Sequence, residues 1–350
     1  MKFIARPFPG RLIQFAFVAL IGFVVAINMP AMAQTEAEVK AQIAKLKPRD
    51  FPTQQIEATV VYPAGGGMDI NGRFVAKFFE KYTDQKIAVN NRTGGAGLVG
   101  HTYLATQAKN DGYTVGVVAT LIFGDSMLRS GGRWSYTDLD PIAFLNSDAM
   151  LLVVSDDGPY KDKSLKEIIE IAKAKPNTVR LTIVPGTMYE YMVEQLEQIS
   201  GAKFLKVPFQ GGAPGVTAML GNNVDVSIAF YGEVRSFLEA KKVNPIGVTS
   251  AERSPFAPNA PTLNEVMNSK DFTWTIIRWL VVPKGTPSDR KAWLAAGFGA
   301  AIRDPELQNE FRKIGAIPNI QISGPEQTAA IVKELGERER AFYLKSGRLK

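Results

Sequence analysis

The order of apolar and polar residues predicts strands that alternate with helices along the chain. Residues 58–62, 86–90 and 179–184 are short apolar runs of strand length, and a stretch with the apolar spacing of a helix follows each of them. The first of these helices places Phe74 and Phe78 on the same face. This pattern indicates elements that pack one face against a common core.

The same alternation continues to the end of the chain. Further strands are expected at residues 113–119, 140–145, 150–154, 203–207, 224–230, 245–249 and 273–282. Further helices are expected at residues 98–109, 188–199, 215–220, 234–241, 288–302, 305–314 and 325–345, with another that begins after Ser164. Ser164 and Glu167 have the spacing of a capping box, Thr187 and Glu190 share it, and Pro214 suits the first position of its helix. The pattern indicates an α/β fold with largely parallel sheets.

Glycine-bearing turns precede three of the predicted helices, at residues 64–69, 94–97 and 186–190. Glycine lets the backbone bend and lets a ligand approach closely, and Asp69 is placed to cap the helix after the first turn. The N–H groups and the dipole at such a helix start favour an anion. Two of these turns that face each other across a cleft would hold a carboxylate from both sides. The alternative is that the turns only serve the fold, as they do in many α/β proteins.

The first 33 residues have the layout of a secretory signal peptide. Lys2, Arg6 and Arg11 precede an apolar run at residues 12–27, and an A-x-A cleavage site ends at Ala33. The apolar run is shorter than the roughly 20 residues that a transmembrane helix needs, which argues against the alternative of a membrane anchor. We therefore expect cleavage after Ala33 and a periplasmic protein.

Composition narrows the chemistry that the chain can perform. There is no cysteine and one histidine, His101, so neither a thiolate metal site nor a metal site with a pair of histidine ligands can be assembled. We expect His101 to be a surface or packing residue. The net charge is +7, and it falls to +4 without the signal peptide, which carries three basic and no acidic residues. Because the basic residues are scattered, a nucleic-acid surface is not expected.

Two glycine motifs suggest nucleotide sites but lack the residues that would complete them. Residues 95–100 match the fingerprint G-x-G-x-x-G, yet no acid follows about 20 residues later, so a glycine-rich loop that opens a helix is the preferred interpretation. The run at residues 65–67 lacks the Lys-Ser/Thr of a P-loop. We expect no cofactor and no metal. Serine, aspartate and lysine are plentiful, so an exported hydrolase acting on a small organic acid remains the alternative to a binding protein.

A series of short motifs follows the first strand. Pro63, Gly66, Gly67, Asp69 and Arg73 form the first motif. Others lie at residues 91–97, 111–114, 207–211, 253–255, 261–265 and 283–287. In content and order this series resembles the extracytoplasmic solute-binding proteins of tripartite tricarboxylate transporters, also called Bug-type receptors. The resemblance covers nearly all of the mature chain.

The resemblance implies a two-domain periplasmic-binding-protein architecture, the Venus flytrap, in which each domain is a mixed, largely parallel sheet flanked by helices. The expected division is a signal peptide at 1–33, a helical extension at 34–55, domain one at 56–147 plus 280–350, and domain two at 148–279. The resemblance also implies a non-catalytic receptor that delivers a small carboxylate to integral-membrane permease subunits. We expect this receptor to be a monomer.

The resemblance places the ligand between two opposed turns, held largely by backbone N–H groups and water. The residues expected at the ligand are Ala64, Gly65, Gly66, Gly67, Met68, Asp69, Thr120, Gly186, Thr187, Met188, Tyr189, Glu190, Phe230 and Arg278.

The second turn departs from the family pattern of Ser-Gly-x-Gly-Ser-x-x-His. Thr187 takes the place of a ligand-binding serine, and Glu190 falls where the histidine is expected. Glu190 either caps its helix or contacts a ligand amine, with capping preferred. The bulky side chains of Met188 and Tyr189 predict a cleft whose lining is more apolar than that of a cleft built to bind citrate. Arg278 either pairs with a second carboxylate of the ligand or forms an ion pair at the domain hinge.

Overall fold

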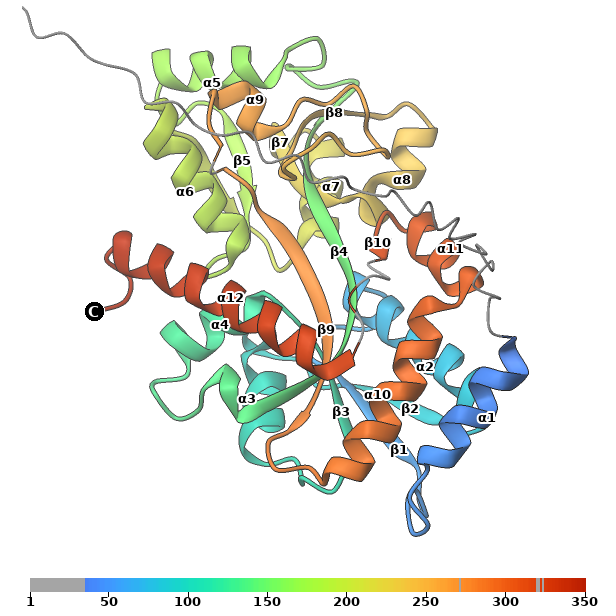
Figure 1. The fold of residues 1–350 in the computed structure, drawn as a ribbon. Helices are drawn as coiled ribbons and strands as arrows, with labels where there is room; N and C mark the ends of the chain where they lie inside the picture. Colours follow the sequence, from blue (N-terminus) through green and yellow to red (C-terminus); the bar gives the residue numbers. More distant parts are fainter. Residues whose placement is uncertain (1–34, 271, 319–321, 323) are drawn as a thin grey trace, which may run out of the picture. The chain divides into compact units, whose positions relative to one another are not determined.

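The apolar runs of the sequence form the strands of a mixed β-sheet (Figure 1). The computed structural model describes residues 35–270, 272–318, 322 and 324–350, so the predicted signal peptide lies outside the described residues. The strands are β1 Ile56–Val60, β2 Ile87–Asn91, β3 Thr114–Ala119, β4 Leu139–Ser155, β5 Arg180–Ile183, β6 Leu205–Pro208, β7 Val226–Phe230, β8 Val243–Val248, β9 Thr275–Pro283 and β10 Ile317–Pro318.

Helices connect most of these strands, as the sequence predicts. They are α1 Glu36–Leu46, α2 Gly67–Thr83, α3 Leu98–Thr106, α4 Leu121–Gly124, α5 Leu165–Ala174, α6 Met188–Ser200, α7 Gly212–Leu220, α8 Tyr231–Glu239, α9 Leu263–Met267, α10 Ser288–Arg303, α11 Pro305–Lys313 and α12 Gly324–Lys345, with short turns η1 Gly95–Gly97, η2 Asp125–Arg129 and η3 Tyr136–Asp138. The capping box of Ser164 and Glu167 is confirmed, because each side chain accepts the backbone N–H of the other residue.

Parallel strands form both ends of the sheet, and antiparallel strands join them. The strand order is β2-β1-β3-β9-β4-β7-β5-β6, with β8 and β10 paired to β4. β1 is parallel to β2 and β3, and β5 is parallel to β6 and β7. β9 runs antiparallel to β3 and β4, and β4 runs antiparallel to β7 and β8. The two parallel parts are therefore connected through β4 and β9.

Strand β4 belongs to both parts of the sheet. Its residues 139–149 pair with β9, and its residues 150–155 pair with β7 and β8. The prediction of two separate strands here is wrong, because pairing with β9 continues through the polar residues Asn146 and Asp148, with two register irregularities on the way. The domain boundary predicted between residues 147 and 148 falls within this strand. The domain boundaries stay predictions.

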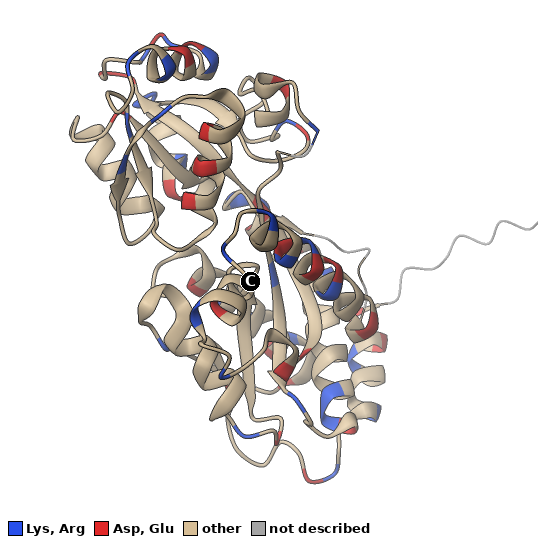
Figure 2. Cartoon of the chain, turned by 90° about the vertical axis from the view of Figure 1, so that its left-hand side faces the viewer, with Lys and Arg blue, Asp and Glu red and all other residues tan. Residues whose placement is uncertain are grey.

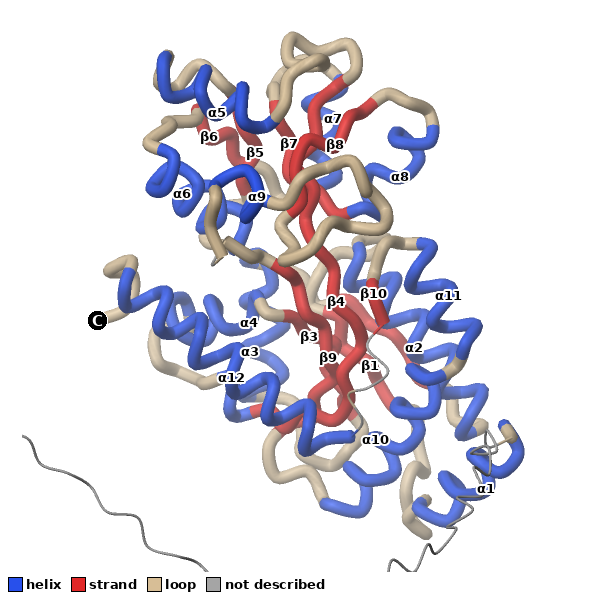
Figure 3. The backbone as a smooth tube through the Cα atoms, turned by 45° about the horizontal axis from the view of Figure 1, so that its top comes forward, coloured by secondary structure: helices blue, strands red, loops and turns tan. Residues whose placement is uncertain are grey.

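Helices lie on both sides of each part of the sheet. In Figures 1 and 3, α2 and α10 lie on one side of β1, β3 and β9, and α3, α4 and α12 lie on the other. In the second part, α5 and α6 lie on one side of the strands and α7 and α8 on the other (Figure 3). Gly72 allows α2 to approach β1, because a Cβ there would come within 2.8 Å of Val60 Cγ2.

The structure corrects or completes the sequence pattern at three local points. Pro214 is the third residue of α7, since Gly211 is the N-cap. The short helices α4 and α9 and the π-helical turn η2 have no counterpart in the sequence pattern. Of the two roles predicted for His101, at the surface or in packing, the structure shows packing, because its side chain is fully buried.

Charged residues of both signs are interspersed along the helices in the view of Figure 2. This agrees with the scattered basic residues of the sequence. None of the described helices is long and apolar enough to cross a membrane. The described residues also contain no group of three or more histidine, aspartate or glutamate side chains arranged to hold a metal ion.

Candidate functional site

The first glycine turn joins β1 to α2, and its conformation depends on Asp69. Gly65 has a φ of 78°, in the left-handed region that favours glycine. The Asp69 carboxylate accepts hydrogen bonds from the Gly65 N–H at 2.9 Å and from Arg73 Nε at 3.0 Å. Burial raises the pKa of Asp69, but these bonds and one from Asn91 outweigh burial and hold the pKa below its usual value. Asp69 does not cap α2 as predicted, because Gly66 is the N-cap and Asp69 is the third helical residue.

The second turn, between β5 and α6, repeats this arrangement. Gly186 has a φ of 71°, and its N–H donates to the Glu190 carboxylate at 2.8 Å, four residues later. Thr187 is the N-cap, and its hydroxyl accepts from the Tyr189 N–H. The capping box predicted for Thr187 and Glu190 is therefore wrong in detail, since Glu190 bonds Gly186 rather than the Thr187 N–H. In both turns a carboxylate fixes the glycine N–H and leaves the first N–H groups of the helix without an intrahelical acceptor.

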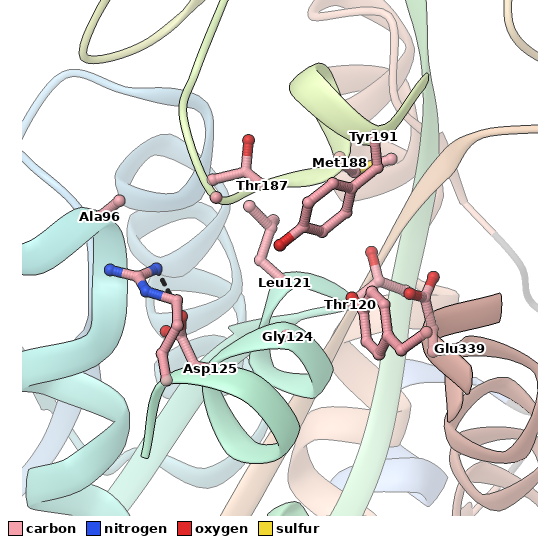
Figure 4. Close-up of a pocket in the computed structure, with 12 residues that line it drawn as sticks. Ala96, Thr120, Leu121, Gly124, Asp125, Thr187, Met188, Tyr191 and Glu339 are labelled. Carbon is pink, nitrogen blue, oxygen red and sulfur yellow. Dashed lines mark hydrogen bonds and ion pairs between the residues drawn. The ribbon is translucent and has the colours of Figure 1, made fainter. Parts of the chain in front are cut away.

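The start of α6 forms one wall of a small pocket (Figure 4). Its cavity volume is about 10 Å³, which is room for about one water molecule. The lining residues come from η1, from the segment of α4 and η2, from the second turn and from α12: Ala96, Thr120, Leu121, Gly124, Asp125, Arg129, Gly186, Thr187, Met188, Tyr191, Glu339 and Tyr343.

The Thr120 side chain in this pocket is buried, with 8% of its surface exposed. Its Oγ1 atom has no hydrogen-bond partner among the described residues. Buried hydroxyl groups are almost always paired, so an unpaired one calls for an explanation. Thr120 and the N-terminus of α6 line the same cavity. Together they offer hydrogen-bond donors to a ligand atom placed between them.

Arg129 supplies a positive charge to the pocket wall. Its Nη1 atom donates to Asp125 Oδ1 at 2.6 Å, and its Nη2 atom donates to the Gly95 carbonyl oxygen. The second carboxylate oxygen of Asp125 lies 2.7 Å from Nδ1 of the buried His101. His101 is thus a packing residue that supports Asp125, and Asp125 in turn orients Arg129.

A second cluster lies at the hinge formed by β4 and β9. Arg278 is buried, and its guanidinium donates to Asn146 Oδ1 at 3.1 Å and to Asp148 Oδ2 at 3.3 Å. Its Cζ atom lies 5.6 Å from the centre of the Phe230 ring. The centre of the Phe230 ring lies 6.0 Å from the centre of the Tyr189 ring. Arg278 therefore forms an ion pair with Asp148 where β4 and β9 meet, and its contact with a ligand carboxylate stays a prediction.

Arg278 also connects to the first glycine turn through two asparagines. Asn146 Nδ2 donates to Asn71 Oδ1 at 2.5 Å, and Asn71 Nδ2 donates to the Gly67 carbonyl oxygen at 2.6 Å. A Cβ on Gly67 would lie 3.6 Å from Arg278 Nη2. Burial raises the pKa of Asp148 to about 7, although Arg278 opposes the shift. The hinge thus holds a partly compensated charge pair next to the first turn, and Phe230 lies between Arg278 and Tyr189 of the second turn.

The structure separates the predicted ligand residues into groups. Thr120, Gly186, Thr187 and Met188 line the pocket. Gly67, Tyr189, Phe230 and Arg278 lie at the hinge cluster. Ala64, Gly65 and Gly66 form the rest of the first turn, Met68 and Asp69 are buried at the start of α2, and Glu190 closes the second turn. The contact of each of these residues with a ligand stays a prediction.

Several pocket residues were missed by the sequence motifs. Asp125 and Arg129 stand four apart, a spacing that indicates a helical ion pair, but no helix was expected at these residues from the apolar pattern. Tyr191 lies one turn after Thr187 on α6, so helical periodicity could have placed it. Glu339 and Tyr343 come from α12, and no local signal connects that helix to the pocket.

Comparisons with known proteins agree with this architecture. The model of the family described as "Tripartite tricarboxylate transporter family receptor" matches residues 72–346. The protein BugT of Bordetella pertussis is 26% identical over 301 residues, which cover 85% of this chain and 90% of that protein. The solved structure of the periplasmic binding protein BugD has a TM-score of 0.76 at 26% identity and covers 86% of this chain and 100% of that one.

A protein of R. palustris, Rpa4515, solved with adipate, has the same fold. Its TM-score is 0.75 at 24% identity, and the match covers 85% of this chain and 99% of that one. The predicted α/β periplasmic-binding-protein architecture is confirmed by these likenesses.

Proposed function

This chain belongs to the tripartite tricarboxylate transporter receptor family, and we propose that it captures a small carboxylate in its pocket and delivers it to integral-membrane permease subunits. Proteins of this family are solute-binding receptors and not enzymes, so the hydrolase alternative is set aside. The receptor acts in the periplasm as a monomer, and it reaches the periplasm through its cleavable signal peptide.

The unpaired Thr120 hydroxyl is the observation that supports carboxylate binding most directly. It shares a cavity with the N-terminus of α6 and with the Arg129 guanidinium. A helix N-terminus and an arginine both favour negative charge, and a hydroxyl can donate to a carboxylate oxygen. A carboxylate in this cavity would accept a hydrogen bond from the Thr120 hydroxyl. Its negative charge would be stabilised by Arg129 and by the N-terminus of α6.

The size of the cavity indicates how the ligand enters. A volume of about 10 Å³ cannot hold a carboxylic acid, so the walls have to separate before binding. The walls come from both parts of the sheet, and β4 and β9 connect these parts. Opening about this hinge admits the ligand, as in other two-domain receptors.

Thermal-shift measurements on the protein test this proposal. The probes are mono-, di- and tricarboxylates and aromatic acids, each compared with its neutral amide. A bound acid should stabilise the protein by about 2.7 kcal/mol at a concentration of 100 times its Kd. Stabilisation by the amides or by sugars, with none by any acid, would overturn the proposal.

Two glycines of α6 give a matched pair of variants for the same experiment. Gly186 precedes the helix and Gly201 ends it, with φ values of 71° and 76°. Alanine at either position should cost about 1–2 kcal/mol of stability through backbone strain. Only Gly186→Ala places a methyl group in a cavity of about 10 Å³ and should remove ligand stabilisation. Equal ligand responses in the two variants would show that the ligand binds elsewhere.

A further inference from the structure

The C-terminal helix α12 contributes two polar side chains to the pocket. Glu339 and Tyr343 line it together with Thr187 and Met188 of the second turn. The Tyr343 ring packs 5.6 Å from the Tyr191 ring, measured between centroids. A Cβ on Gly124 would lie 3.1 Å from the Tyr343 hydroxyl oxygen, so this ring fits closely against α4. Packing therefore holds Tyr343 in place, and Tyr343 in turn donates a hydrogen bond to Glu339.

The pocket holds side chains of opposite charge that are bound to different partners. Arg129 is paired with Asp125, whereas Glu339 receives a hydrogen bond from Tyr343. The ion pairs found among the described residues include none between Arg129 and Glu339. Figure 4 shows Asp125 and Glu339 on opposite sides of Leu121 in that view. The cavity thus has the ion pair of Arg129 and Asp125 on one side and the Glu339 carboxylate on the other.

The positive charge near Glu339 does not outweigh the effect of its burial. Burial raises the pKa of Glu339, although the hydrogen bond from Tyr343 and the charge of Arg338 oppose the shift. A second anion near Glu339 would be repelled by it. A ligand group that donates a hydrogen bond would instead provide the compensation that the carboxylate lacks.

We propose that Glu339 determines specificity in this pocket by selecting carboxylates that carry a hydrogen-bond donor, such as a hydroxyl or ammonium group, near the carboxylate. The carboxylate lies toward Arg129, Thr120 and the start of α6, and the donor lies toward Glu339. This inference rests on the proposed function and narrows its ligand class.

Ligand binding through Glu339 should depend on pH. A donor bound to Glu339 favours the ionised carboxylate, so binding releases a proton from the fraction of molecules in which Glu339 is protonated. Affinity should therefore rise with pH through the range in which the free Glu339 titrates. The charged and titratable groups that interact with Glu339 are Arg338 and Tyr343 on α12 and Tyr191 on α6. Behind them, Arg348, Glu190 and Arg129 act on Tyr191, and Asp125 acts on Tyr343.

Calorimetric titration with matched acids tests the proposal. The two series are propionate, lactate and alanine, and succinate, malate and aspartate, in which one position carries hydrogen, hydroxyl or ammonium. Donor-bearing acids should bind roughly tenfold more tightly, or better, than the unsubstituted acid of the same series. Comparison of the hydroxyl and ammonium members shows which donor is preferred.

Two substitutions in α12 test whether Glu339 causes the preference for donor-bearing acids. Glu339→Gln keeps an acceptor for Tyr343 but removes the charge, so it should abolish the preference and the pH dependence. Glu337→Gln is the control, because Glu337 is exposed and pairs with Lys333 on the same helix. Its preference should equal that of the unmodified protein.

Three other results would each contradict the proposed role of Glu339. Equal or tighter binding of the unsubstituted acids overturns the role of Glu339 while the proposed function stands. A preference that survives in Glu339→Gln also overturns that role. Binding of none of the six acids, together with no stabilisation by any acid in the thermal-shift panel, overturns both the inference and the proposed function.

Discussion

The Thr120 hydroxyl is a residue-scale feature that costs stability in the unliganded protein. A buried hydroxyl without a partner loses its hydrogen bonds to water and gains none in return. Valine has nearly the same shape but no hydroxyl. We expect Thr120→Val to leave stability unchanged or raise it by about 1 kcal/mol, and to weaken carboxylate binding roughly tenfold. Denaturant unfolding and calorimetric titration measure the two effects.

Thr182 is the control for this prediction. It is also buried, but its hydroxyl accepts a hydrogen bond from the Ile228 N–H at 2.9 Å. Thr182→Val leaves that N–H unpaired and should cost about 1–3 kcal/mol of stability without a direct effect on affinity. Unchanged affinity in Thr120→Val would show that the hydroxyl does not contact the ligand.

Asp148 gives a second residue-scale prediction, for the pH dependence of stability. Burial raises its folded-state pKa to about 7, whereas the carboxyl of an unfolded chain titrates near its ordinary pKa of 3.8. The folded protein therefore binds this proton more tightly. Its contribution to the free energy of unfolding falls as pH rises from about 4 to about 7, by on the order of a few kcal/mol.

Asp148→Asn removes this titration. Relative to the unmodified protein, the variant should gain stability as pH rises from about 4 to about 7, with no further change above that range. Denaturant unfolding at several pH values measures the difference between the two proteins. A difference that is constant from pH 4 to pH 8 would contradict the raised pKa.

At the scale of elements, α12 and the residues after it contact both parts of the sheet and so hold the two parts together. It packs on β4, and beyond its end Arg348 forms an ion pair with Glu194 of α6 and lies 4.5 Å from the centre of the Tyr191 ring. Phe342 of the same helix contacts the Trp274 ring at 5.2 Å. Opening of the pocket would break these contacts, so they favour the closed arrangement.

We expect Arg348→Ala to speed ligand dissociation roughly two- to tenfold, because it removes one cation–π contact and one ion pair from the closed form. Surface plasmon resonance or stopped-flow fluorescence measures this rate. Arg340→Ala is the control, since Arg340 is exposed on the same helix. Equal dissociation rates in both variants would mean that α12 does not restrain opening.

At the scale of the molecule, the two parts of the sheet share a strand. β4 has 17 residues and pairs with neighbours in both parts. If one part of the sheet unfolded, β4 would lose its hydrogen-bonded neighbours in that part. The edge of β4 would then be unpaired next to the part that remained folded. We expect a single calorimetric transition whose calorimetric and van't Hoff enthalpies agree. Two transitions separable by pH or denaturant would show that the parts unfold independently.

The size of the mature protein is a further prediction at this scale, and it comes from the sequence alone. If the signal peptide is cleaved after Ala33, protein recovered from the periplasm should begin at Gln34, which mass spectrometry of the intact chain can measure. A mass that includes residues 1–33 would favour the membrane-anchor alternative.

The sequence by itself determined the features that depend on neighbours along the chain. Apolar periodicity and glycine position predicted the strand, turn and helix at residues 56–83 and again at 180–200, because burial of one face and left-handed backbone angles are local requirements. The capping box at Ser164 was predicted for the same reason. The order of motifs further indicated the receptor family.

Only the tertiary structure decided which of these local features meet. Gly186 and Glu339 are separated by about 150 residues, and they share a pocket because α12 packs back onto β4. The polar Asn146 and Asp148 interrupt the apolar pattern of β4, yet pairing with β9 carries the strand through them. Arg278 of β9 contacts Asn146 and Asp148 of β4 through the same long-range pairing. Long-range packing and pairing set these contacts, and neither leaves a signal within a short stretch of sequence.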